Sequence, residues 1–181
     1  MLKVLLATAV AATAFTPLIA DEPNPAKVHV DSFVVMGIST ITTNEREATP
    51  DGLIPKMWAR LRSEDILNRI PNRKDNSIIA VYSNYENGRK ASYRYTLGAA
   101  VNPTRFVPRG MVTQTIHAGA YTRYTAQRTA PSAVVDLWKR IWSDEKPGGL
   151  ERAYKTDYEV YPQGLIENTS KSRIDIYIGL K

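Results

Sequence analysis

The 181-residue chain contains no cysteine and only two histidines, His29 and His117. Disulfides, iron–sulfur clusters, thiolate zinc sites and a cysteine nucleophile all require sulfur, so the composition excludes each of them. The two histidines have no spacing relation typical of metal ligands. We therefore expect no bound metal and no cofactor, haem included.

Other chemistry-bearing motifs are missing as well. The stretch Gly37-Ile38-Ser39-Thr40-Ile41 lacks the second glycine of a nucleophile elbow, and no glycine-rich loop suited to phosphate is present. The net charge of +6 arises from scattered Lys and Arg that form no dense tract, which argues against nucleic acid as a partner. The content of 43% hydrophobic and 23% charged residues is typical of one packed globular domain, here rich in aromatic residues: ten Tyr, three Trp and three Phe.

The first 20 residues have the pattern of a signal peptide. Lys3 precedes an apolar run over residues 4–15, and the helix breaker Pro17 and the small residue Ala20 follow. The run is too short to cross a bilayer, so we expect cleavage, a periplasmic location and no stable membrane insertion afterwards. The alternative is an uncleaved leader that tethers the domain to the outer face of the inner membrane. Residues 21–27 read as an extended linker.

The remaining chain, residues 28–181, is predicted to be one domain built from two copies of a single unit. Four landmarks recur in the same order about 80 residues apart. They are Gly37 and Gly119, Trp58 and Trp138, Tyr85 and Tyr161, and Gly98 and Gly179. The two halves span about 28–101 and 108–181.

Each half has the hydrophobic periodicities of a β-α-β-β unit. The first predicts strands at 28–42, 77–85 and 91–101, and the second predicts strands at 112–126, 156–161 and 173–180. Helical spacing relates Ile54, Met57, Trp58 and Leu61 in the first half, and Val134, Leu137, Trp138 and Ile141 after Pro131 in the second. The fold class is therefore α+β, with both helices on one side of a shared, largely antiparallel sheet and approximate two-fold symmetry. A groove between the helices is the expected ligand site.

The order of several short strings resembles the gyrase-inhibitor-like (GyrI-like) effector-binding domain, found in AraC-type and MerR-type regulators and also alone. The strings are AVYSNYE at 80–86, YTLG at 95–98, PRGM at 108–111, GAY at 119–121, WKRIW at 138–142, YKTDYEVY at 154–161 and DIYIG at 175–179. The resemblance implies an SHS2-type tandem fold whose central groove holds hydrophobic, often aromatic and cationic, small molecules. It also implies an acidic residue at the groove floor, which matches Glu159. This chain departs from the regulators in two respects. No helix-turn-helix precedes the domain, and an export signal precedes it instead.

The residues themselves also single out Glu159. On a strand, Asp157, Glu159 and Tyr161 point to one face, while Tyr158 and Val160 point to the other. The repeat aligns the first three with Val81, Ser83 and Tyr85. A carboxylate that faces packed helices is costly to desolvate, so it serves as a cation receptor, as an acid or base, or as a structural partner of a nearby Arg, Lys or Tyr.

Aromatic side chains are the candidates for the groove walls. Ring faces attract cations and flat apolar molecules, although an aromatic residue at helical spacing is also a common core residue. The predicted ligand-binding set is Glu159, Tyr82, Tyr85, Trp58, Trp138, Tyr121 and Tyr161.

Three functions remain open from the sequence. The first is a periplasmic protein that binds a hydrophobic or aromatic, optionally cationic, small molecule. The second, which the resemblance makes available because some relatives hydrolyse strained genotoxins, is a hydrolase with Glu159 as acid or base and Tyr85 or Tyr121 assisting. The third is an interaction protein that antagonises a protein partner.

Overall fold

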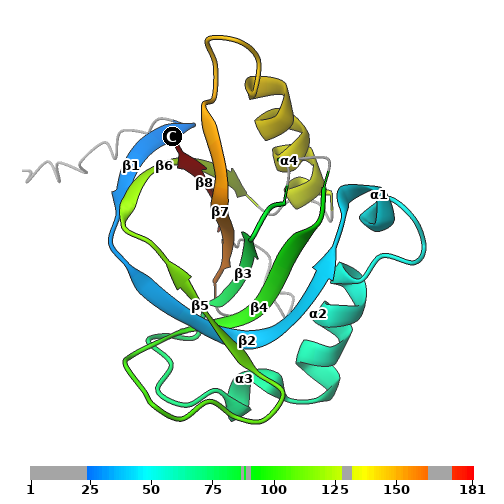
Figure 1. The fold of residues 1–181 in the computed structure, drawn as a ribbon, viewed down its shortest axis with the longest axis vertical. Helices are drawn as coiled ribbons and strands as arrows, with labels where there is room; N and C mark the ends of the chain where they lie inside the picture. Colours follow the sequence, from blue (N-terminus) through cyan, green and yellow to red (C-terminus); the bar gives the residue numbers. More distant parts are fainter. Residues whose placement is uncertain (1–23, 87, 89–90, 128–131, 163–172) are drawn as a thin grey trace, which may run out of the picture.

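The computed structural model describes residues 24–86, 88, 91–127, 132–162 and 173–181, which form eight strands and four helices. All eight strands belong to one antiparallel sheet in the order β1-β6-β8-β7-β3-β4-β2-β5 (Figure 1). The strands are β1 (Ala26–Val30), β2 (Phe33–Thr42), β3 (Ile78–Ser83), β4 (Tyr93–Val101), β5 (Val112–Ile116), β6 (Gly119–Gln127), β7 (Arg152–Tyr161) and β8 (Arg173–Leu180). The helices are α1 (Asn44–Glu47), α2 (Ile54–Ser63), α3 (Ile66–Arg69) and α4 (Ala133–Asp144).

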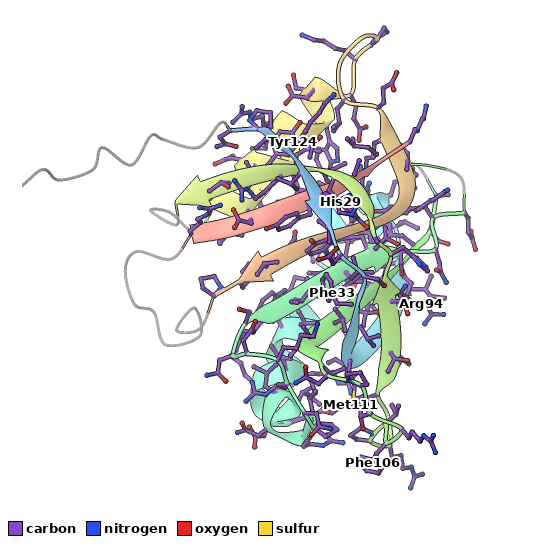
Figure 2. The ribbon with its side chains drawn as sticks, turned by 90° about the vertical axis from the view of Figure 1, so that its left-hand side faces the viewer. His29, Phe33, Arg94, Phe106, Met111 and Tyr124 are labelled. Carbon is purple, nitrogen blue, oxygen red and sulfur yellow. The ribbon has the colours of Figure 1, made fainter. Side chains whose placement is uncertain are left out.

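The sheet curls until its two ends meet. β1 pairs with β6 and β2 pairs with β5 in one shared register, which runs from Ala26 opposite Arg123 to Gly37 opposite Val112. The sequence predicts a single strand where the structure has β1 and β2, and another where it has β5 and β6. Each predicted strand is interrupted by two residues, and the two interrupted strands run side by side where the sheet closes (Figures 1 and 2).

The two long helices pack on the outer face of this curl (Figure 1). Pro55 lies in the first turn of α2, where a missing backbone N–H costs nothing. α2 buries Met57 and Leu61, and α4 buries Leu137, Trp138 and Ile141, as their helical spacing predicts. Both helices therefore turn an apolar stripe toward the sheet.

Strand alternation divides the core into two layers. Beneath α2 the outer face contributes large side chains such as Tyr95, Leu97 and Met36. The inner face holds a second cluster that includes Tyr121 and Tyr158. Since successive residues of β7 point to opposite faces, Glu159 and Tyr158 belong to different layers.

The α+β class, the single antiparallel sheet and the helices at both predicted positions are confirmed. The predicted linker is too long by two residues, because β1 begins at Ala26. The predicted signal peptide, residues 1–20, lies outside the described residues. None of the described helices has the length and apolar character needed to cross a membrane.

Candidate functional site

A cavity of about 620 Å³ opens between α2 and α4 on the outer face of the sheet. The helices supply the walls, β3, β4 and β7 supply the floor, and α1 closes one side. Six of the seven predicted ligand-binding residues line this cavity: Trp58, Tyr82, Tyr85, Trp138, Glu159 and Tyr161. The remaining lining residues are Asn44, Glu47, Ile54, Pro55, Arg62, Tyr93, Val134, Val135, Trp142 and Arg152.

Glu159 lies at the floor of the cavity and is 2% exposed. Its backbone is opposite Ala80 of β3 and Ile176 of β8. The repeat aligns Glu159 with Ser83, which pairs with Thr156 and whose side chain bonds Gln114 of β5. Glu159 is therefore an acidic residue flanked by apolar positions in the centre of the sheet.

Three neutral donors hold the Glu159 carboxylate. Oε1 accepts hydrogen bonds from the Tyr82 hydroxyl at 3.0 Å and from Trp138 Nε1 at 2.6 Å. Oε2 accepts one from the Tyr161 hydroxyl at 2.7 Å. The donors come from β3, α4 and β7, so both halves of the chain contribute to orienting this one group.

Burial raises the pKa of the Glu159 carboxyl, and the three hydrogen bonds oppose that shift. In the described part of the chain no Lys or Arg forms an ion pair with it. The negative charge of Glu159 is thus stabilised by dipoles alone. Such a group gains most from a cation that enters the cavity.

Aromatic rings surround the carboxylate. Tyr82 meets Trp138 edge-on at 5.1 Å between ring centroids, and Trp58 meets Tyr161 in the same manner at 4.9 Å. The indole nitrogen of Trp58 donates to the Tyr95 hydroxyl at 3.0 Å, which fixes this ring from behind. These edge-on contacts leave the rings in a rigid arrangement around an apolar cavity with a charged floor.

A buried ionic cluster, centred on Arg152, forms a second part of the site. Arg152 Nη2 lies 2.7 Å from Asp157 Oδ2, and Nη1 lies 2.9 Å from Glu145 Oε1. Tyr85 donates to Asp157 Oδ2 at 2.6 Å and accepts from Arg152 Nη2 at 2.9 Å. The other Asp157 oxygen accepts the Gly179 backbone N–H at 2.9 Å. Asp157 is thus fully paired, in contrast to Glu159 two residues along the same strand.

Arg152 also lies over aromatic faces. Its guanidinium carbon is 4.4 Å from the Tyr154 ring centroid and 5.4 Å from those of Tyr85 and Trp138. The protein thus places its own cation in one part of the aromatic lining, held there by two carboxylates. The sequence pattern did not reveal Arg152, because a register shift between Arg152 and Asp157, with Tyr154 at a φ of 53°, breaks the strand alternation that would have placed it.

Tyr121 is the one predicted site residue that lies elsewhere. It belongs to the inner cluster on the opposite face of the sheet, edge-on to Tyr158 at 5.7 Å, and its hydroxyl donates to the His117 carbonyl at 3.1 Å. The prediction placed it in the groove because strand parity cannot be counted through the break between β5 and β6. Tyr121 therefore takes no part in this cavity, either as a wall or as an assisting group.

Glu47 is a second acidic lining residue that the sequence pattern did not reveal. Its carboxylate accepts the backbone N–H groups of Leu53 at 2.9 Å and Ile54 at 3.0 Å, and it also bonds the Thr42 hydroxyl. Leu53 has no side chain that could cap α2, so Glu47 does this from outside the helix. A glutamate seven residues before a helix start is not a recognised capping signal, which is why the prediction omitted it.

The arrangement is suited to holding a cation. Among the described residues no group of three or more Asp, Glu or His is placed to hold a metal ion, and both histidines are exposed (His29, Figure 2). The Tyr85 hydroxyl, predicted to assist in hydrolysis, is committed to Asp157 and Arg152. The hydrolase alternative stays a prediction.

Comparison with known proteins places this fold and cavity in a defined class. Residues 28–180 match the family model of Cass2, the integron-associated effector-binding protein. YobU of Bacillus subtilis (strain 168), whose name marks it as a proposed transcriptional regulator, is 30% identical over 156 residues, which cover 84% of this chain and 95% of YobU.

Solved structures share the fold at lower identity. The integron cassette protein VCH_CASS2 of Vibrio cholerae has a TM-score of 0.67 and 21% identity, over 87% of this chain and 96% of its own. The structure of SAV2435 bound to tetraphenylphosphonium has a TM-score of 0.69 and 19% identity, over 88% of this chain and 94% of its own.

These findings define the class as effector-binding domains, related to the GyrI-like ligand-binding domains of transcription regulators. Within that class, the chain belongs to the Cass2 family of integron-associated effector-binding proteins.

Proposed function

We propose that this protein binds a hydrophobic, aromatic cation in the cavity between α2 and α4, with Glu159 as the charged floor. The observation that carries the proposal is the buried Glu159 carboxylate, which is held by three neutral donors and paired with no cation among the described residues. A bound cation would supply the positive charge that no described protein group supplies to Glu159.

The rest of the cavity favours the same ligand. The faces of aromatic rings attract cations, and the helices add the apolar side chains of Ile54, Val134 and Val135 to the walls. The buried Arg152 is matched by Asp157 and Glu145, so this cluster does not neutralise Glu159. A volume of about 620 Å³ is within the range of small-molecule sites. The aromatic cation in the SAV2435 structure is consistent with this class of ligand.

The test is calorimetric titration with tetraphenylphosphonium and with triphenylphosphine oxide, a neutral molecule of similar aromatic character. We expect wild type to bind the cation more tightly than the oxide. Glu159→Gln keeps the shape of the side chain and removes its charge. Because the cation then loses its charged partner, we expect cation binding to weaken about tenfold or more, which corresponds to about 1.4 kcal/mol or more of binding free energy. Binding of the oxide should change little.

Glu45→Gln is the matched control, since Glu45 is an exposed acidic residue of α1 that does not line the cavity. It should leave both affinities unchanged. Equal cation affinity in wild type and Glu159→Gln would rule out the role assigned to Glu159.

We also infer that the protein works in the periplasm, on the basis of the leader pattern in residues 1–20. Recovery of the protein in the periplasmic fraction of its host would support this, and recovery in the cytoplasm alone would contradict it.

A third inference is that the two halves are copies of one SHS2-type unit related by approximate two-fold symmetry. The strand order supports it, because β3 and β7 are central neighbours and the remaining strands follow outward from each in corresponding order. Superposing one half on the other should place Trp58 on Trp138, Tyr85 on Tyr161 and Gly98 on Gly179. A best superposition that matches other residues would contradict the repeat.

A further inference from the structure

Tyr93 is a cavity residue that the proposed binding mode does not use. It is the first residue of β4, opposite Thr42 of β2, and it is 3% exposed. Its ring packs 5.5 Å from Tyr82 and 5.7 Å from Tyr85, measured between centroids, and it lines the same cavity as Glu159.

The hydroxyl of Tyr93 differs from those of the other cavity tyrosines. Tyr82 and Tyr161 donate to Glu159, and Tyr85 donates to Asp157. Among the residues the structure describes, the Tyr93 hydroxyl has no hydrogen-bond partner. The Tyr93 ring is buried, but its hydroxyl oxygen is not one of the fully buried unpartnered atoms among the described residues, so it borders the cavity, where a ligand can supply the partner.

The surroundings of Tyr93 determine which kind of partner that is. Burial raises the pKa of the Tyr93 phenol, and the negative charges of Glu47 and Glu159 raise it further, while Arg152 opposes them. The phenol therefore keeps its proton at neutral pH and acts as a donor. Neither nearby carboxylate accepts a hydrogen bond from Tyr93, since their described donors are other groups, so the phenol is left to donate into the cavity.

We propose that Tyr93 is a specificity-determining residue that donates a hydrogen bond to an acceptor oxygen of the ligand. The preferred ligands are then aromatic cations that also carry a carbonyl, ester or ether oxygen, rather than purely hydrocarbon cations. Glu159 binds the positive charge, and Tyr93 binds the oxygen of the same molecule. This inference rests on the proposed cation-binding function and adds a second recognition point to it.

The test uses two aromatic quaternary ammonium ions of similar size and equal charge. Ethyl 4-(trimethylammonio)benzoate carries an ester, and 4-butyl-N,N,N-trimethylanilinium carries an alkyl chain in its place. Both are titrated by calorimetry into wild type, Tyr93→Phe and Tyr82→Phe. The Tyr82→Phe variant is the matched control, because it removes a hydroxyl that bonds Glu159 and should therefore change the affinities for both cations alike.

We expect Tyr93→Phe to weaken binding of the ester about 3- to 10-fold, the range of one neutral hydrogen bond, and to leave binding of the alkyl cation within about twofold. Equal changes for both cations, or no change for either, would overturn the role of Tyr93 while the proposed function stands. If wild type binds neither cation, the proposed function fails and the inference fails with it.

A second measurement checks the unpartnered hydroxyl without any ligand. Replacing Tyr93 by Phe removes no hydrogen bond within the protein, so the urea midpoint of unfolding should stay the same or rise. Tyr82→Phe removes a bond to Glu159, so its midpoint should fall. A fall for Tyr93→Phe as large as that for Tyr82→Phe would show that a protein group already uses the hydroxyl, and would overturn the inference.

Discussion

Two carboxylates on one face of β7 show how residue-level context separates structure from function. Asp157 and Glu159 are both buried, at 0% and 2% exposure, and they lie two residues apart. Asp157 is paired with Arg152 and accepts bonds from Tyr85 and the Gly179 backbone. Glu159 has only neutral donors. The first carboxylate maintains the fold, and the second is available to a ligand.

We therefore expect Arg152 to contribute more to the stability of the fold than to ligand binding. Replacing it with Gln leaves the buried Asp157 and the half-buried Glu145 without a cation, and removing one partner of a buried pair costs about 3–5 kcal/mol. We expect the free energy of unfolding from urea titration to fall by an amount of this order.

Arg60→Gln is the control for that measurement. Arg60 forms an ion pair with Glu64 on the exposed side of α2, and pairs of this kind contribute about 0–1 kcal/mol. If Arg152→Gln cost no more than Arg60→Gln, the buried cluster would not be the structural element described above.

The sequence allowed much of the site to be predicted residue by residue, because Glu159, Tyr82, Trp58 and Trp138 lie on regular elements whose periodicity fixes their direction. It did not allow Arg152 or Tyr121 to be placed. Arg152 lies beyond a register shift in β7, and Tyr121 follows a break between two strands, so counting alternation fails at both.

At the scale of elements, β2 and β4 approach each other closely at a pair of glycines. Gly37 lies opposite Gly98, and a Cβ at Gly37 would come within 2.1 Å of the Leu97 carbonyl oxygen. A Cβ at Gly98 would come within 1.9 Å of the Met36 carbonyl oxygen. Two glycines are therefore needed where the backbones of these neighbouring strands come this close.

Gly37→Ala should thus be strongly destabilising, by at least the roughly 1–3 kcal/mol typical of overpacking, because the obstructing atoms are backbone. Gly119, its counterpart in the predicted repeat, has no atom within 4 Å of the position a Cβ would take, so Gly119→Ala should change the free energy of unfolding by little. Urea titrations of the two variants test this, and equal effects would show that the close approach at Gly37 does not limit the fold.

The closure of the sheet is the element-level feature that the sequence could not reveal. Alternation predicts strands and their buried faces, and helical spacing predicts the two long helices and their apolar stripes correctly. Which strand ends meet is set by pairing between residues almost a hundred positions apart, from Ala26 opposite Arg123 onward. A local pattern carries no information about such partners, so closure of the sheet does not follow from it.

At the scale of the whole molecule, the Cass2 family match and the charged aromatic cavity agree on small-molecule binding. The proposed cation binding depends on the ionised form of Glu159, whose negative charge attracts the ligand. Burial raises the pKa of Glu159, so the folded protein takes up a proton there at a higher pH than the unfolded chain does. As pH falls through that raised pKa, the ligand-free protein gains stability from this group, while a bound cation must first displace the proton.

The most direct measurement is the dissociation constant for tetraphenylphosphonium from pH 8 down to pH 4, which is below the ordinary glutamate pKa of 4.5, in wild type and in Glu159→Gln. The phosphonium charge does not titrate, so any pH dependence comes from the protein. We expect wild-type affinity to weaken on acidification, approaching tenfold per pH unit below the raised pKa of Glu159, and the variant to bind weakly with a flat profile. A flat wild-type profile, or the same slope in both proteins, would contradict the assignment of Glu159 as the cation receptor.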